Sequence, residues 1–187
     1  MERIIAFKSA AQWEKWLSKN HSDSKGIWLR FFRKDSEIAT IKNPEALDVA
    51  LCYGWITGQA RPYDEESWLG WFCPRRPKSI WSKINTGHAE RLIKEGRMKP
   101  AGLRQIEIAK EDGRWNRAYS PQRAAVIPAD FIKELNKNKE AKAFFKTLNK
   151  TNTYSIVFRL ENTKSPQQRK EKISTIIKML SRKDKFH

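Results

Sequence analysis

The sequence predicts an α+β fold, mainly helical, with a small antiparallel sheet of about three strands in the N-terminal part and a helical C-terminal tail. Three short segments rich in aromatic and branched residues, a composition typical of strands, all precede Pro74. Later segments carry helical periodicity instead. Because helices and strands do not alternate as repeated βαβ units, a doubly wound parallel sheet is not expected.

The first elements are a helix over Ala10–Lys19, capped by the serine before it, and a strand over Gly26–Arg33 (GIWLRFFR). A second helix is predicted over Pro44–Tyr53. Asn43 suits its N-cap, a proline takes its first position, and the glycine that follows ends it.

Two further strands, Trp55–Tyr63 and Ser67–Cys73, are joined by an acidic turn and complete the predicted sheet. Ser79 is then expected to cap a helix over Ile80–Glu95, whose apolar residues follow the helical period. The next helix is predicted over 100–112, opened by a proline and ended by a glycine.

The segment Trp115–Ile127 contains a proline and has no clear period. We interpret it as the connection between an α+β domain, residues 1–120, and a helical region, residues 128–182. Limited proteolysis is therefore expected to cut this connection first.

The tail is predicted to hold two short helices, one near Asp130 and one over Glu140–Leu148. The segment Thr153–Leu160 (TYSIVFRL) is ambiguous between strand and helix. The last helix has the clearest signal. Ser165 and Gln168 fit a capping box, and apolar residues recur from Ile173 at helical spacing.

The chain has 187 residues and a formal net charge of +17, and the charge is unevenly placed. Residues 1–70 hold 10 Lys and Arg against 10 Asp and Glu, whereas residues 71–127 hold 13 against 5 and residues 128–187 hold 15 against 6. Such a basic surface attracts polyanions, anionic lipid surfaces or phosphorylated small molecules. The alternative is a solvated lysine-rich surface that aids solubility.

Two cysteines, three histidines and no metal-type spacing predict no metal site, and no sequence motif points to a cofactor. No signal peptide and no apolar run long enough to cross a membrane is seen, so we expect a cytoplasmic protein without membrane insertion. Cys73 is the only tempting nucleophile because cations follow it, but a small buried thiol at a strand end is ordinary, and that structural interpretation is favoured. No catalytic residue is therefore assigned.

The strongest site signal is the stretch WFCPRRPKSIWSKIN, residues 71–85, where cations precede a predicted helix. Unpaired amides and the helix dipole attract anions at that end, and arginine supplies planar donors for phosphate or carboxylate. The structural alternative is that two of these arginines pair with the acidic hairpin turn at Asp64. The predicted anion site consists of Arg75, Arg76, Lys78, Ser79, Ser82, Asn85, Arg97 and Arg114, with an aromatic wall of Trp55, Trp81 and Trp115.

Four ordered blocks, ALCYGWITG (50–58), PRRPKSIWSKIN (74–85), GRMKPAG (96–102) and AKEDGRWNRAY (109–119), resemble the YdeI/OmpD-associated bacterial family. The tail, from VIPADF (126–131) to RLENTKSPQQRKEKI (159–173), is similar to the OmdA-type C-terminal region of that family. The resemblance implies a cytoplasmic protein linked to stress resistance and to protection against bacteriocins and antimicrobial peptides. It implies no established catalytic mechanism, cofactor or substrate.

Three functional hypotheses remain open. The first is a non-enzymatic protective protein that binds an anionic ligand or partner at the predicted site. The second is a nucleic-acid-binding protein that uses residues 71–187 without sequence specificity. The third is an enzyme acting on a phosphorylated metabolite.

Overall fold

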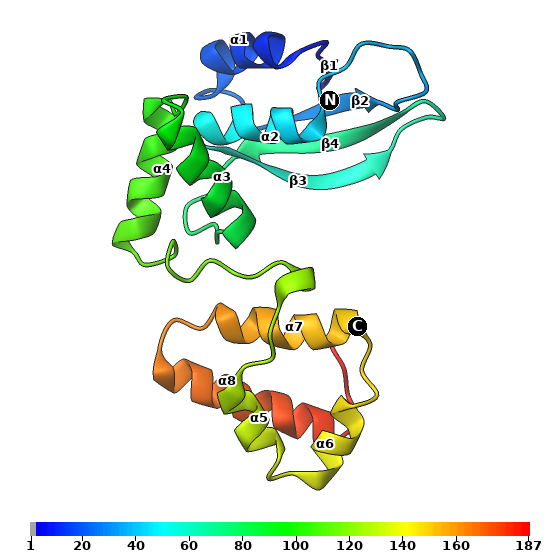
Figure 1. Cartoon of the computed structure of the whole chain (residues 1–187), viewed down its shortest axis with the longest axis vertical. Coiled ribbons are helices and arrows are strands. Elements are labelled where there is room, and N and C mark those ends of the chain that lie inside the picture. Colours follow the sequence, from blue (N-terminus) through cyan, green and yellow to red (C-terminus); the bar gives the residue numbers. More distant parts are fainter. Residues whose placement is uncertain (1–2) are drawn as a thin grey trace. The chain divides into compact units, whose positions relative to one another are not determined.

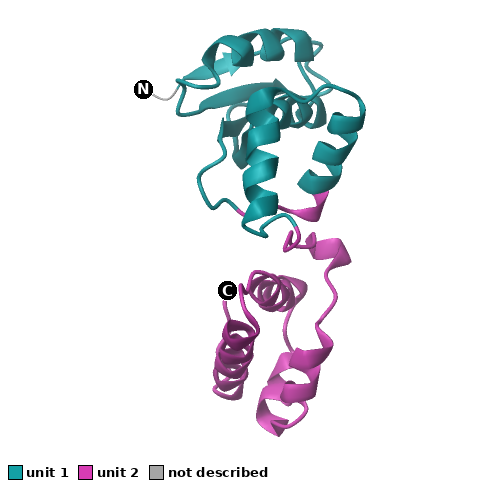
Figure 2. Cartoon of the chain, turned by 90° about the vertical axis from the view of Figure 1, so that its left-hand side faces the viewer, with its two compact units in different colours: residues 1–79, 85–115 teal, residues 80–84, 116–187 magenta. Residues whose placement is uncertain are grey.

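The structure is a computed structural model that describes residues 3–187 (Figure 1). Contacts divide the chain into two compact units (Figure 2). The first unit comprises Met1–Ser79 and Asn85–Trp115, and the second comprises Ile80–Ile84 and Asn116–His187. The α+β prediction is confirmed, because a sheet lies in the first unit and helices form the C-terminal part.

The sheet of the first unit has the strand order β1-β2-β4-β3. Its strands are β1 (Ile4–Ala6), β2 (Ile27–Phe32), β3 (Trp55–Pro62) and β4 (Ser67–Pro74). The three predicted strands form its antiparallel part, and β1 adds a parallel fourth strand beside β2. Three residues are too few to show a strand pattern, which is why the sequence did not reveal β1.

Helices α1 (Ala10–Asn20) and α2 (Asn43–Cys52) lie along one face of this sheet (Figure 1). The Ser9 hydroxyl accepts a hydrogen bond from the amide of Gln12, which confirms the predicted cap. The Trp13 ring lies fully buried between the elements, with its centroid 5.8 Å from that of Phe72 in β4. Its indole N–H donates to the carbonyl of Ala46 in α2, so one side chain joins two helices and the sheet.

Helix α4 (Pro100–Glu111) packs closely on α2. A Cβ at Gly102 would lie 2.4 Å from the carbonyl oxygen of Cys52, so only glycine permits this approach. The N-cap of α2 is Lys42, one residue before the predicted Asn43. The three glycines that follow helices in this unit, Gly54, Gly96 and Gly113, have positive φ, as a left-handed helix terminus requires.

Helix α3 (Lys83–Lys94) begins three residues later than predicted. The residues before it, Ile80 to Ser82, are not helical, and Ser82 forms an isolated parallel bridge with Tyr119. The predicted apolar stripe of this helix included Ile80 and Ile84. These two side chains are 43% and 41% exposed, so the stripe is not buried at its start. The bridge between Ser82 and Tyr119 thus takes the place of the first helical turn that the sequence predicted.

The second unit contains a short 3-10 helix η1 (Gln122–Ala124) and four α-helices. These are α5 (Ala129–Leu135), α6 (Lys139–Phe145), α7 (Lys150–Glu161) and α8 (Pro166–Ser181). Their core is centred on Phe131, Ile156, Leu160, Ile176 and Leu180, each at most 2% exposed. The ambiguous segment Thr153–Leu160 is helical, and its residues Ile156 and Leu160, four positions apart, both belong to this core.

Candidate functional site

The cationic loop after β4 is shaped by a tight turn. The Ser79 amide donates to the carbonyl of Arg76 at 3.0 Å, and Lys78 between them has φ of 66°. Proline at the second position and a positive φ at the third fit a type II turn. Ser79 is consequently a turn residue and does not cap α3, and the first helical amide, that of Lys83, donates to the Tyr119 carbonyl at 2.9 Å.

Arg114 holds this loop in place. Its guanidinium donates to the carbonyl of Ser79 at 2.6 Å, and its Nε lies 2.6 Å from a carboxylate oxygen of Asp112. The side chain is only 11% exposed, so these bonds use it as a structural brace. The guanidinium of Arg97 forms a salt bridge with the Glu95 carboxylate at 3.2 Å.

Burial separates the two adjacent arginines of the loop. Arg75 is 6% exposed, whereas Arg76 and Lys78 are exposed. In the acidic hairpin turn, Asp64 is bound by Arg30 at 2.7 Å. The side chains in the loop that face solvent as cations are thus Arg76 and Lys78, and the anion site stays a prediction for them.

The three tryptophans of the predicted wall do not form one surface. Trp55 is 1% exposed, and its indole N–H donates to the carbonyl of His21. Trp81 is 2% exposed and belongs to the second unit. Trp115 is half-buried, with Lys110 Nζ 5.5 Å from its ring centroid. The buried rings serve as packing surfaces.

Neither thiol is activated by its surroundings. Burial raises the pKa of Cys73, and the lowering effects of Trp71, Arg76 and Arg75 do not offset it. Burial also raises the pKa of Cys52 to about 11. A raised pKa keeps the thiolate population small near neutral pH, which disfavours the nucleophile hypothesis.

An acid–base cluster that sequence reasoning missed joins α2 to α3. The Asp48 carboxylate contacts His88 Nδ1 at 2.7 Å and the guanidinium of Arg91. Burial alone would raise the pKa of Asp48, but hydrogen bonds from Arg91 and His88 lower it below its ordinary value. The only signal in the sequence was the three-residue spacing of His88 and Arg91, which places both on one helix face.

A second missed network fixes the connection inside the second unit. Ser120 is 5% exposed, and its amide and hydroxyl donate hydrogen bonds to the Glu161 carboxylate at 2.9 and 2.7 Å. Lys83 Nζ donates to the Ser120 hydroxyl oxygen at 2.9 Å, and the Tyr154 hydroxyl donates to the Ser120 carbonyl at 3.0 Å. Residues this far apart in sequence give no local signal of their meeting.

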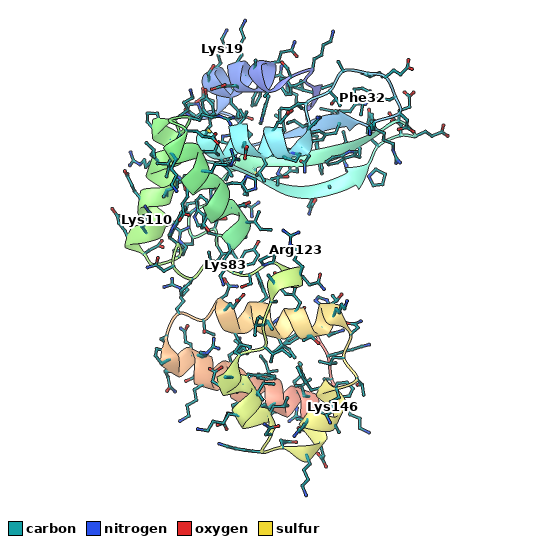
Figure 3. The ribbon with its side chains drawn as sticks, viewed as in Figure 1. Lys19, Phe32, Lys83, Lys110, Arg123 and Lys146 are labelled. Carbon is teal, nitrogen blue, oxygen red and sulfur yellow. The ribbon has the colours of Figure 1, made fainter. Side chains whose placement is uncertain are left out.

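Positive charge is concentrated in the second unit. Residues 80–84 and 116–187 hold 18 Lys and Arg against 6 Asp and Glu, a net of +12, while the rest of the chain holds 20 against 15. Lys139 and Lys142 of α6 and its C-cap Lys146 are exposed and share one face, since their spacing is three and four residues. Lys146 is marked in Figure 3. These three residues, 139, 142 and 146, form the lysine face of α6.

Among residues 3–187, no group of histidine, cysteine and carboxylate side chains is arranged to hold a metal ion. No helix within the same described range is long and apolar enough to cross a membrane.

Two family models match the chain. The first, described as Domain of unknown function (DUF8412), covers residues 5–105, and the second, described as Bacteriocin-protection, YdeI or OmpD-Associated (OmdA), covers residues 124–183. No curated protein and no solved structure is significantly similar to the chain.

The resemblance of the tail to the OmdA region is confirmed, whereas three of the four earlier blocks fall within the other match. Because the DUF8412 model matches more than half of the 187 residues, the chain belongs to the DUF8412 family, and its C-terminal part is an OmdA domain, YdeI/OmpD-associated.

Proposed function

We propose that this protein protects bacteria against bacteriocins and antimicrobial peptides from the cytoplasm, by binding an anionic partner through its OmdA region. The observation that carries the proposal is the coincidence of the OmdA match with the unit of net charge +12. Cationic peptides would be repelled by such a unit, so protection acts indirectly, through an anionic regulator, nucleic acid or envelope component.

The contact is proposed to involve the lysine face of α6. These side chains are exposed, and the phenylalanines of the same helix, Phe144 and Phe145, pack against the core of the unit instead. The helix is therefore held from one side and presents its lysines on the other. Long flexible lysines bind a polyanion with little geometric selectivity and with strong salt dependence.

The test is survival of a strain that lacks the gene and is complemented with variants. Lys139→Gln/Lys142→Gln/Lys146→Gln should lose protection against a bacteriocin while remaining folded. A matched variant that removes the same charge from α8, Lys170→Gln/Lys172→Gln/Lys178→Gln, should retain most of it. Equal survival of the α6 variant and the wild type would contradict a role for the lysine face.

Nucleic acid is the second candidate partner, favoured by the same net charge. Binding of a short DNA duplex, measured by fluorescence anisotropy at several salt concentrations, should weaken steeply with salt if the partner is a polyanion. Sequence preference among duplexes is not expected, since phosphate contacts alone carry no sequence information.

A further inference from the structure

The second unit contains a pocket of about 770 Å³, a volume within the range of small-molecule sites. Its walls come from three places: Ile84 at the start of α3, the connection around η1, and α7 together with Leu148 just before it. The apolar side chains among them include Ile84, Ala125, Leu148 and Val157. All of the lining residues belong to the second unit.

The walls are fixed by the contacts described above and by one ring contact. The network of Ser120, Glu161 and Tyr154 fastens the middle of the connection to α7. The ring of Tyr119 meets that of Phe158 at 4.9 Å, nearly edge to face. The connection is therefore held against the helix on one side of the pocket, and the cavity is formed before any ligand arrives.

The lining combines apolar surface with one sign of charge. Arg123 and Lys150 contribute to it, and no aspartate or glutamate does. Arg123 lies on η1, where Figure 3 marks it. Ile84, which is 41% exposed, supplies apolar surface to the pocket together with Ala125, Leu148 and Val157. A purely ionic ligand would leave this surface in water, and a neutral apolar one would leave the two cations unused.

We propose that this pocket binds a small amphiphilic anion, with an apolar body against Ile84, Ala125, Leu148 and Val157 and a phosphate or carboxylate head between Arg123 and Lys150. The inference rests on the proposed function for the sign of the ligand's charge. The pocket is a different site from the lysine face of α6, and its ligand is of a different class, because the pocket adds an apolar lining to the positive charge.

The probe is 1-naphthyl phosphate, with inorganic phosphate as the head alone and 1-naphthol as the body alone. Binding to the full chain is measured by isothermal titration calorimetry. Naphthyl phosphate should bind at least about tenfold more tightly than either fragment, because only the whole molecule uses both surfaces. Arg123→Gln/Lys150→Gln should weaken it by about tenfold or more, since two charge-assisted bonds are lost.

The control variant is Lys170→Gln/Lys172→Gln, which removes the same charge from α8 outside the pocket lining. It should change the affinity for naphthyl phosphate less than about twofold, because neither lysine lines the pocket and salt screens exposed charges. Thr153→Trp, which adds bulk to another lining residue, should abolish binding, and circular dichroism verifies its fold.

Three results would overturn the pocket: no naphthyl phosphate binding at about 1 mM, where even weak ligands register, equal affinity for inorganic phosphate, or equal loss in the control variant. The proposed function fails by a different result. If the α6 variant keeps its duplex affinity and its protection while the pocket variants lose naphthyl phosphate, the lysine face is wrong and the pocket stands.

Discussion

Removing the Glu161 carboxylate is the sharpest test of how the connection is fastened to the second unit. In Glu161→Ala, the buried amide and hydroxyl of Ser120 lose their acceptor. Leaving a buried donor unsatisfied costs about 1–3 kcal/mol, and two donors are involved. Glu161 is itself half-buried, so water replaces part of the loss. We therefore expect a loss of about 2–3 kcal/mol in the unfolding free energy of this unit.

For a unit of 77 residues, that loss corresponds to a fall of roughly 10–20 °C in melting temperature. Far-ultraviolet circular dichroism can follow the melting of the second unit, because this unit contains five of the helices, η1 included. The control is Glu171→Ala, an exposed residue of α8 whose carboxylate accepts a hydrogen bond from the Gln167 side chain. It removes the same charge and should cost less than about 0.5 kcal/mol. Equal melting of the two variants would refute the anchoring role of Ser120 and Glu161.

Three further outcomes are expected. Arg76→Gln should keep the fold and reduce the rise in melting temperature that sulfate causes in the wild type, measured by calorimetry at matched ionic strength; an unchanged rise would remove the loop as an anion site. Asp48→Asn should lower stability by about 1–3 kcal/mol at neutral pH. Because the folded-state pKa of Asp48 is lowered, its contribution is complete above the unfolded value near 3.8 and disappears as pH falls through the folded value, so the gap between variant and wild type should close in acid urea titrations. Cys73→Ser should retain protection, since its raised pKa argues against a nucleophile, and complete loss in a folded variant would restore that role.

The connection remains the predicted site of first proteolysis, and the structure narrows its position. Val126 is 78% exposed, whereas Ser120 is buried and fastened. Trypsin is expected to cut first after Arg123, as mass spectrometry of the fragments would show. First cleavage within Trp55–Cys73 would mean that the hairpin is not part of a packed sheet.

Local features were predictable because neighbouring residues determine them. Ser9 and Ser165 cap their helices as expected, each accepting from the amide three residues later. Gly96 and Gly113 follow the ends of α3 and α4, and the hairpin of β3 and β4 was readable from its two strands and acidic turn. In each case a few adjacent residues satisfy the backbone or set its dihedral angles.

Features formed by distant residues were decided only by the tertiary structure. The segment Thr153–Leu160 has the composition of a strand, yet it is helical because Ile156 and Leu160 complete the core of the second unit. Helix α3 begins later than the sequence predicted because Ser82 pairs with Tyr119.

The same reason explains the site. The sequence located the charge, and it named a cationic loop and its tryptophans, but burial could not be read from it. Folding turned Arg114 into a brace, buried Trp55 and Trp81 in packing, and brought Ile84 to the pocket that α7 lines. A binding surface depends on which side chains remain exposed beside each other, and that depends on packing between segments that are remote in the chain.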